Sequence, residues 1–191
     1  MRSPVALLAA LSLLPACLGP RVDGSRYFTL PTAGAPAAGA PVPTVGLGPV
    51  TLPAYLSRPE VAVRIGPEQL SYSSTDRWAA PLEDLVAAAL GEELRAALPA
   101  RDVVRWPWPL GAPPDVAASV EFLRFEGDAA GGATLQARWT VSAHGKPPVS
   151  GETRLHEGGT PGDVPGSVTA LGRALERLAA DLASAARASA R

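Results

Sequence analysis

Few residues in this sequence have the types and spacing that chemistry requires, and they do not cluster. The two histidines, His144 and His156, lie twelve residues apart in strand-end and turn contexts. A hydrolase needs a nucleophile beside a base, and the sequence contains no Gly-x-Ser-x-Gly elbow. Two isolated histidines without clustered carboxylates are also weak metal ligands. We therefore predict that the chain is not an enzyme and holds no metal, and nothing in the sequence indicates a cofactor.

A short glycine pattern superficially resembles a nucleotide-binding loop. Gly46-Leu47-Gly48 has the spacing with which a dinucleotide loop begins. Such a loop must open a helix, whereas here Pro49 follows and no helical pattern begins. The pattern therefore gives no support to a nucleotide site.

The only cysteine, Cys17, lies directly after an export signal. Arg2 gives a positive start, and the apolar run at 5–14 is about ten residues long, against the ~20 needed to span a bilayer. A lone cysteine also excludes an intramolecular disulfide. Leu14-Pro15-Ala16-Cys17 resembles the lipobox of bacterial lipoproteins, in which the cysteine sulfur receives a diacylglyceryl group before cleavage. This resemblance implies that residues 1–16 are removed and that acyl chains on Cys17 hold the protein on a membrane.

The charge of the remaining chain excludes one large class of partner. Removing residues 1–16 removes one basic side chain, Arg2, and leaves 16 basic and 18 acidic residues, a net charge of −2 over 175 residues. Nucleic-acid-binding domains are strongly basic, so we predict no nucleic-acid partner. The sequence also shows no polybasic patch suited to anionic lipid.

Two tryptophan-containing segments are candidates for binding. The polar run 73–78, which includes Asp76 and Arg77, ends at Trp78 and is either an exposed recognition loop or a lead-in to a helix. Trp106 and Trp108 have the spacing that places two rings on one side of a strand. Such rings are common at interfaces, and equally common in the core at a sheet edge, so both interpretations stay open.

The periodicity of the sequence predicts the elements that must position these residues. Residues 81–98 and 164–188 carry leucines and alanines at helical spacing. Strand-like segments occur at 45–52, 61–65, 70–73, 102–106, 119–126, 134–143 and 149–156. In the segment 134–143 apolar and polar residues alternate, which predicts one buried and one solvated face. The order favours an α+β fold with a mainly antiparallel sheet and two helices packed on one face.

Three regions follow from this pattern. Residues 1–16 form the lipoprotein signal peptide, and residues 17–43 form the lipidated N-terminus with a spacer rich in proline, alanine and glycine. A short strand is expected at 27–30. We expect the low-complexity part, 31–43, to act as a loop or tether that lets the domain stand off from its anchor. Residues 44–191 form a single α+β domain.

Several separated motifs resemble the PqiC/YmbA family, the auxiliary lipoproteins of ABC-type and MCE-type membrane transport systems. They occur in order as the run from Val45 to Glu60, Arg64 and Leu70, the run from Asp76 to Leu82, and Val103-Val104 before Trp106-Pro107-Trp108. The aromatic segment 27–30 after the lipobox also matches the start of these proteins. The resemblance is specific over residues 14–108 and thin from Gly111 onward.

The resemblance implies a non-enzymatic subunit in the outer membrane that faces the periplasm and serves lipid transport and membrane integrity. Its partners would be MCE-domain or ABC transporter subunits, and a homo-oligomer is left open. We expect a docking face near Arg58, Arg64, Asp76, Arg77 and Trp78. The alternative is a lipid-binding carrier in which Trp106 and Trp108 line an apolar pocket.

Overall fold

The computed structural model describes residues 23–32, 34, 44–100, 102–109, 111–160 and 164–190. Within these ranges the chain forms eight strands, two α-helices and one short 3-10 segment. In chain order they are β1 (Arg26–Phe28), β2 (Val45–Thr51), η2 (Ala54–Leu56), β3 (Glu60–Gly66), β4 (Gln69–Trp78), α1 (Leu82–Ala97), β5 (Val103–Arg105), β6 (Val116–Asp128), β7 (Ala133–Ala143), β8 (Val149–Glu157) and α2 (Val164–Ala190).

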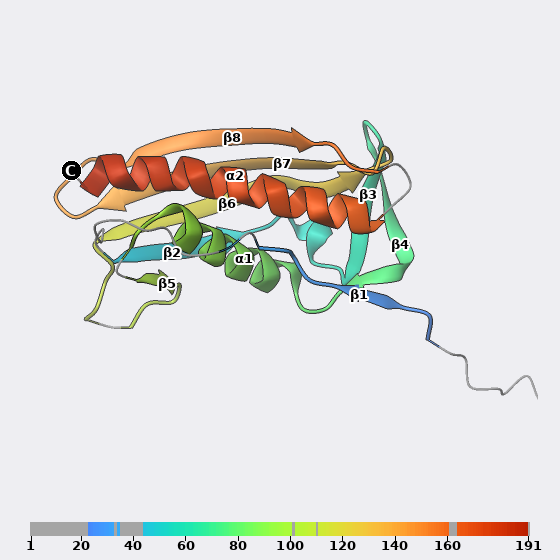
Figure 1. Cartoon of the computed structure of the whole chain (residues 1–191), viewed down its shortest axis with the longest axis horizontal. Helices are drawn as coiled ribbons and strands as arrows, with labels where there is room; N and C mark the ends of the chain where they lie inside the picture. The colour runs from blue at the N-terminus through green and yellow to red at the C-terminus, as the bar shows by residue number, and fades with distance from the viewer. Residues whose placement is uncertain are drawn as a thin grey trace, which may run out of the picture.

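All eight described strands join one sheet, in which β6 is the longest member (Figure 1). One edge of β6 pairs with β7, and β7 pairs with β8, both antiparallel. The other edge is divided between two strands: β2 pairs with the first half of β6, and β3 pairs with its end at Gly127 and Asp128. Beyond β2 lies β5, and beyond β3 lie β4 and then β1. The short segment η2 therefore connects strands that lie at opposite ends of β6.

The predicted α+β fold is confirmed, and the sheet is mixed. Its longest ladders are antiparallel, whereas the pairs β1–β4, β2–β5, β2–β6 and β3–β6 are parallel. The two helices begin and end within two residues of the bounds expected from their apolar stripes. In β7, Leu135, Ala137 and Val141 are buried and Arg138 is exposed, which confirms the predicted alternation.

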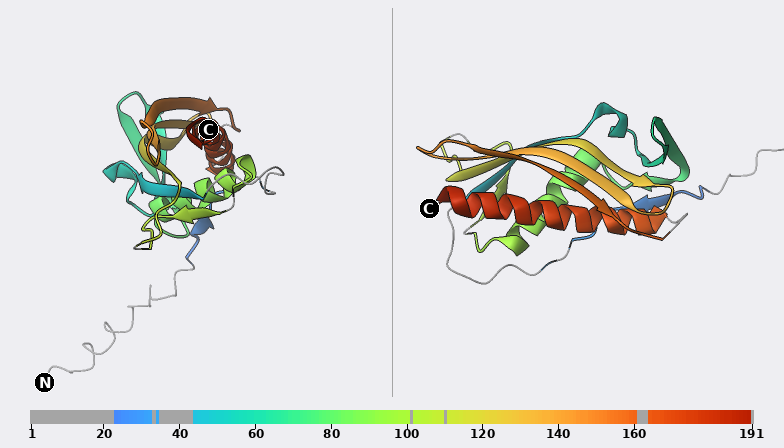
Figure 2. Two further views of the ribbon diagram at one scale, coloured as in Figure 1. Left: turned by 90° about the vertical axis from the view of Figure 1, so that its left-hand side faces the viewer. Right: turned by 90° about the horizontal axis from the view of Figure 1, so that it is seen from above.

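Both helices cover the same face of the sheet, and the core lies between the two layers. Figure 2 shows them on one side of the curved strands. α2 packs across β6, β7 and β8, while α1 packs against β2, β5 and α2. The apolar stripe of α2, including Leu171, Leu175, Leu178 and Leu182, is fully buried against the sheet and α1. Burying each such leucine contributes roughly 1.5–3 kcal/mol, so packing of the stripe outweighs the intrinsic helix propensity of this segment.

The chain is held on both sides of the low-complexity segment 31–43, most of which lies outside the described residues. β1, which overlaps the strand expected at 27–30, is already paired with β4. After β1 the chain runs onto the helices, since Pro31 packs against Gly172 of α2. At the other end, the Thr44 amide donates a hydrogen bond to Asp115. The described residues on both sides of this segment therefore belong to the same domain, and its role as a tether stays a prediction.

Among the residues that the structure describes, no helix has the length and apolar character needed to cross a membrane.

Candidate functional site

Cys17, the predicted lipidation site, lies outside the described residues. The described chain begins at Asp23 and enters β1 at Arg26. Lipidation of Cys17 therefore stays a prediction, and the candidate sites on the folded domain are considered next.

Two of the residues expected on a docking face are buried, and they hold β1 in the sheet. Trp78 is 5% exposed and belongs to the core, and Asp76 is 3% exposed. Asp76 accepts a 2.6 Å hydrogen bond from the Arg26 guanidinium and a 2.8 Å bond from the Ser73 hydroxyl. The Arg26 bond holds the pKa of the Asp76 carboxyl below its usual range, against the opposing effect of burial. As side chains, Asp76 and Trp78 are structural in this fold and do not present a docking surface.

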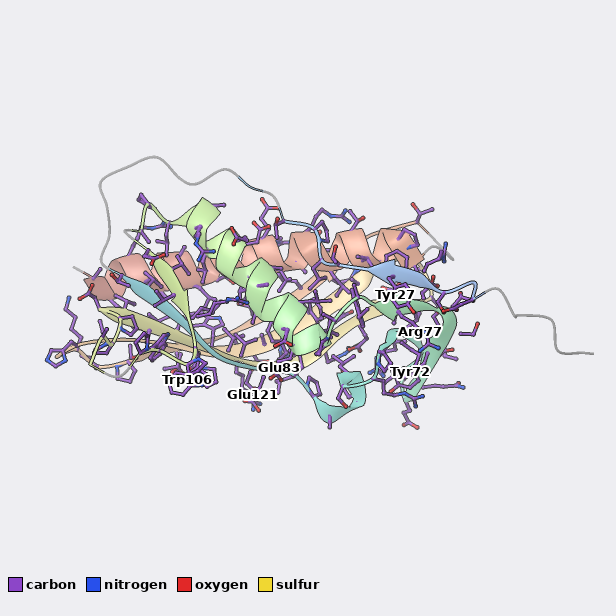
Figure 3. The ribbon with its side chains drawn as sticks, turned by 90° about the horizontal axis from the view of Figure 1, so that it is seen from below. Tyr27, Tyr72, Arg77, Glu83, Trp106 and Glu121 are labelled. Atoms are coloured by element: carbon purple, nitrogen blue, oxygen red, sulfur yellow. The ribbon has the colours of Figure 1, made fainter. Side chains whose placement is uncertain are left out.

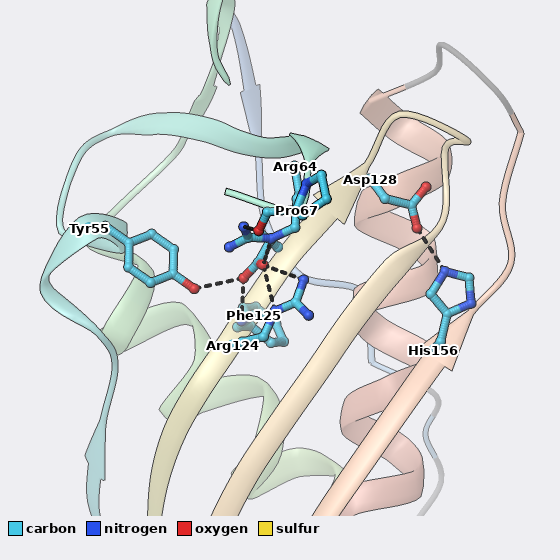
Figure 4. A network of polar contacts seen from close by, with 8 residues as sticks. Tyr55, Arg64, Pro67, Arg124, Phe125, Asp128 and His156 are labelled. Atoms are coloured by element: carbon cyan, nitrogen blue, oxygen red, sulfur yellow. Dashed lines mark hydrogen bonds and ion pairs between the residues drawn. The ribbon is translucent and has the colours of Figure 1, made fainter. Parts of the chain in front are cut away.

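Arg64, also expected on that face, is bound to a buried carboxylate. Glu126 of β6 has no exposed side-chain surface, and it accepts hydrogen bonds from the Arg64 guanidinium at 2.7 Å, the Arg124 guanidinium at 2.9 Å and the Tyr55 hydroxyl at 2.7 Å (Figure 4). The Phe125 amide also donates to it. These donors come from η2, β3 and β6. The cluster therefore links η2 and β3 to β6, in the part of β6 that lies between the residues paired with β2 and those paired with β3.

The pKa shifts in this cluster agree with a Glu126 carboxylate that is ionised at neutral pH. Burial disfavours the charged form of Glu126, but its hydrogen bonds outweigh this effect and hold its pKa below the usual range. Burial, together with hydrogen bonding to Glu126, raises the pKa of the Tyr55 hydroxyl above its usual value. The bond to Glu126 also raises the pKa of Arg64. A fixed ionised carboxylate with satisfied partners is suited to joining elements rather than to moving protons.

Arg58 and Arg77 are the two members of the predicted docking set that reach the surface. Both contact Glu60, at 3.2 Å and 3.4 Å respectively, and the Arg58 guanidinium lies 4.5 Å from the centroid of the Tyr72 ring. Figure 3 shows Tyr72 and Arg77 at the same end of the molecule as Tyr27 of β1. Partner binding by this pair stays a prediction.

Trp106 and Trp108 form a second surface, at the other end of the sheet. Their rings meet edge to face, with centroids 4.9 Å apart. Trp106 is 55% exposed, whereas Trp108 is partly buried. Trp106 is thus a surface residue and Trp108 is packed at the sheet edge; binding by Trp106 stays a prediction.

The glycines of Gly46-Leu47-Gly48 provide the space for these two rings. A Cβ atom on Gly46 would lie 2.6 Å from the Trp108 ring, and one on Gly48 would lie 2.5 Å from Cβ of Trp106. Gly48 also has a φ angle of +128°, which side chains rarely adopt. The two glycines of β2 and the two tryptophans after β5 are each spaced two residues apart, so that Gly46 faces Trp108 and Gly48 faces Trp106.

The two tryptophans open onto separate hollows rather than one apolar cavity. Trp106 borders a groove of about 570 Å³ between β2 and the start of α1, lined also by Glu83, Asp84, Ala87 and Arg105. Trp108 borders another of about 400 Å³ with Pro113, Asp115 and His144. Both linings mix charged and apolar groups. The groove at Trp106 does not have the mainly apolar lining expected of a lipid pocket.

The groove at Trp106 carries acidic groups that lack cationic partners. Among the described residues, no ion pair involves Glu83 or Asp84, which line this groove, or Glu121, which lies outside its lining. Figure 3 shows Trp106, Glu83 and Glu121 on one face of the molecule. Glu83 and Asp84 lie in the first turn of α1, where the helix dipole favours negative charge. An exposed indole beside carboxylates that have no ion-pair partner is suited to receive a basic side chain.

The two histidines are surface residues. His144 is exposed beside the hollow at Trp108. His156 lies 2.8 Å from Asp128, whose carboxylate also accepts the amides of Ala130 and Gly132 in the β6–β7 turn (Figure 4). The pair thus fixes a turn. Within the described residues, no group of three or more histidine, cysteine or acidic side chains is placed to hold a metal ion.

Comparison with known proteins identifies the family. Residues 28–183 match the sequence model of a family described as the ABC-type transport auxiliary lipoprotein component. The chain belongs to the ABC-type transport auxiliary lipoproteins. This family is one of transport auxiliaries and not a known enzyme family. The resemblance to PqiC/YmbA-type proteins seen in the sequence is confirmed by this match.

Solved structures agree with this assignment at the level of the fold. The auxiliary lipoprotein superposes with a TM-score of 0.69 on an uncharacterised protein of 20% identity, covering 84% of this chain and 97% of that one. It also resembles a Xanthomonas campestris protein of the DUF330 family, with a TM-score of 0.68, 17% identity, and 83% and 92% of the two chains covered. No protein with a curated description matches the sequence.

Sequence reasoning missed two sets of side-chain contacts in the auxiliary lipoprotein. The shared spacing of the glycines 46 and 48 and the tryptophans 106 and 108 was a usable signal for their pairing. The Glu126 cluster had none, because Tyr55 and Arg64 lie 71 and 62 residues from Glu126 in the sequence.

Proposed function

We propose that the chain is a periplasm-facing lipoprotein subunit of an ABC-type or MCE-type envelope transport system, attached through acyl chains on Cys17 to the outer membrane. It acts by docking to a transport partner, in lipid trafficking and membrane integrity, and performs no chemistry itself. The observation that carries this proposal is the family match over residues 28–183, which names an ABC-type transport auxiliary lipoprotein. The lone cysteine after an export signal supports the lipid attachment.

The exposed ring of Trp106 supports a docking site at the groove between β2 and α1. Large aromatic side chains that are exposed in a free protein are frequent anchors of binding interfaces. The neighbouring carboxylates of Glu83 and Asp84 lack ion-pair partners and would attract a basic side chain of the partner. Arg58 and Arg77 offer less, because both guanidinium groups already contact the Glu60 carboxylate.

Co-purification of the full-length lipoprotein from detergent-solubilised membranes tests the proposal. Mass spectrometry would quantify MCE-domain and ABC transporter subunits recovered with the wild type, with Trp106→Ala, and with Arg58→Ala/Arg77→Ala. We expect Trp106→Ala to weaken docking by about 2 kcal/mol, or ~30-fold, as for an interface hot spot, and the double variant to retain the partner. Circular dichroism would establish that each variant folds.

The three outcomes separate the candidate surfaces. Loss of the partner only in the arginine variant would move docking to the β1 end. Retention in both variants would exclude both surfaces, and absence of any transport subunit from the wild-type preparation would contradict the proposed function.

A further inference from the structure

The position of β1 limits how the domain can sit on a membrane. β1 is joined to the sheet by pairing with β4 and by the ion pair between Arg26 and Asp76, at 2.6 Å. The chain that follows is also held, because Leu30 is buried and Pro31 packs on α2. If Cys17 is the anchor, only the chain from Cys17 to Arg26 can separate lipid from the fold. This inference therefore rests on the proposed lipidation.

The length of that connection is short compared with the domain. Nine residue steps separate Cys17 from Arg26, and a fully extended chain covers at most about 30 Å over that length. The domain is longer, because the 13 residues of β6 run along it and span roughly 40 Å. β1 lies near one end and the start of β8, at Val149, lies at the opposite end (Figure 1).

These two lengths exclude one upright orientation. With the Val149 end on the bilayer and the domain standing, β1 would lie about 40 Å above the lipid, beyond the reach of the connecting chain. The β1 end can rest on the membrane without any such conflict. The remaining alternative is a domain that lies flat.

The chemistry of β1 distinguishes these two orientations. Tyr27 is 61% exposed, more than any other large hydrophobic side chain among the described residues. It lies in the middle of β1, opposite Arg77. Tyrosine has an apolar ring and a polar hydroxyl, and such side chains are enriched where a membrane meets water. An exposed tyrosine ten residues after the proposed lipid attachment point, on the first described strand, is therefore placed to contact the headgroup region.

We propose that the β1 end of the domain lies on the lipid surface, with Tyr27 among the headgroups, and that the Trp106 groove faces away from the membrane. Tyr27 and Trp106 lie towards opposite ends of the molecule (Figure 3). The segment 31–43 then has no part in setting the height of the domain above the membrane. The residues between Cys17 and Arg26 set it.

Site-specific fluorescence on the full lipoprotein tests this orientation. Cys17 is acylated in the proposed mature protein, so Tyr27→Cys or Val149→Cys would supply the single reactive thiol for a fluorophore. Both positions are exposed strand residues, which makes them matched controls. The labelled proteins would be placed in phosphatidylethanolamine and phosphatidylglycerol vesicles containing a headgroup spin-labelled lipid. We expect several-fold stronger quenching of the probe at 27 than of the probe at 149.

Insertions test which segment sets the height. Gly-Ser-Gly-Ser inserted after Gly24 should reduce quenching at position 27, because no atom packs where a Gly24 side chain would lie and the connection simply lengthens. The same insertion after Ala38 should leave quenching unchanged. Equal quenching at 27 and 149, or an equal effect of the two insertions, would overturn the proposal.

Only protein whose N-terminal peptide carries the acyl mass would be used in these vesicles. Failure of lipidation would thus be recognised before any quenching is measured. A wrong orientation is thereby distinguished from a wrong anchor.

Discussion

Replacing Glu126 with glutamine should destabilise the domain strongly, although the side chains are nearly the same size. The carboxylate accepts hydrogen bonds from Tyr55, Arg64, Arg124 and the Phe125 amide. Glutamine keeps one acceptor oxygen and turns an amide donor towards the others. The two arginine side chains are 23% and 35% exposed and can bond to water instead, so the main loss falls on the more buried donors.

The magnitude follows from those donors. A buried donor left without an acceptor costs about 1–3 kcal/mol, so we expect a loss of about 3 kcal/mol in the free energy of unfolding. For a domain of this size such a loss lowers Tm by roughly 6–12 °C. Urea unfolding and thermal melts of the mature chain carrying Cys17→Ser would measure both quantities.

The difference between wild type and Glu126→Gln should also depend on pH. The folded-state pKa of Glu126 lies below its unfolded value of about 4.3, so the ionised carboxylate stabilises the fold fully above that pH. This contribution is lost as pH falls through the folded pKa, and the two proteins should converge in acid. Glu152→Gln is the matched control, since Glu152 has several partners but is exposed, and it should change little. A Glu126→Gln variant as stable as the wild type at pH 7 would refute the reasoning.

Three further perturbations have definite expected outcomes. Gly46→Ala should lower the free energy of unfolding by about 1–3 kcal/mol and shift tryptophan fluorescence, because the new methyl group overlaps the Trp108 ring. Gly158→Ala, which has open space around it, is the control and should change neither quantity. Equal melting temperatures of the two variants would contradict the packing of Trp108 on Gly46. Asp76→Ala should release β1 from the sheet, measured as faster amide exchange and faster proteolysis at residues 23–30. Protection equal to that of the wild type would show that the hydrogen bonds of Asp76 with Arg26 and Ser73 do not hold this strand. Leu175→Ala, at a fully buried position of α2, should lower the free energy of unfolding measured by chemical denaturation by about 2–5 kcal/mol. Glu176→Ala, at the exposed neighbouring position, is the control and should change it little. Similar values for the two variants would show that this face of α2 is not part of the core.

The elements with strong periodicity were predictable from the sequence. The leucine and alanine stripe of α2 and the alternation in β7 depend on neighbours within the same element, so their existence and bounds could be inferred. The same alternation, applied to 76–78, would have placed Asp76 and Trp78 on the buried side and Arg77 outside. The polar residues before Trp78 instead indicated either an exposed recognition loop or a lead-in to a helix, whereas β4 continues through them.

Contacts between distant parts of the chain were not predictable. The low-complexity composition of 31–43 suggested a free tether, because nothing near it in sequence indicates that Pro31 packs on Gly172 or that β1 pairs with β4. The Glu126 cluster likewise depends on how β6 is shared between β2 and β3. Such pairing is decided by the whole sheet, and no local pattern in the sequence specifies it.

Attachment of the protein to the outer membrane depends, in our proposal, on lipid at Cys17. Mass spectrometry of the N-terminal peptide, from protein purified out of the membrane fraction, tests this most directly. We predict a peptide that begins at Cys17 and carries the mass of a diacylglyceryl group with any further acyl chain, and no such peptide from Cys17→Ser. An unmodified Cys17 in wild-type protein, or a mature chain that retains residues 1–16, would contradict the account.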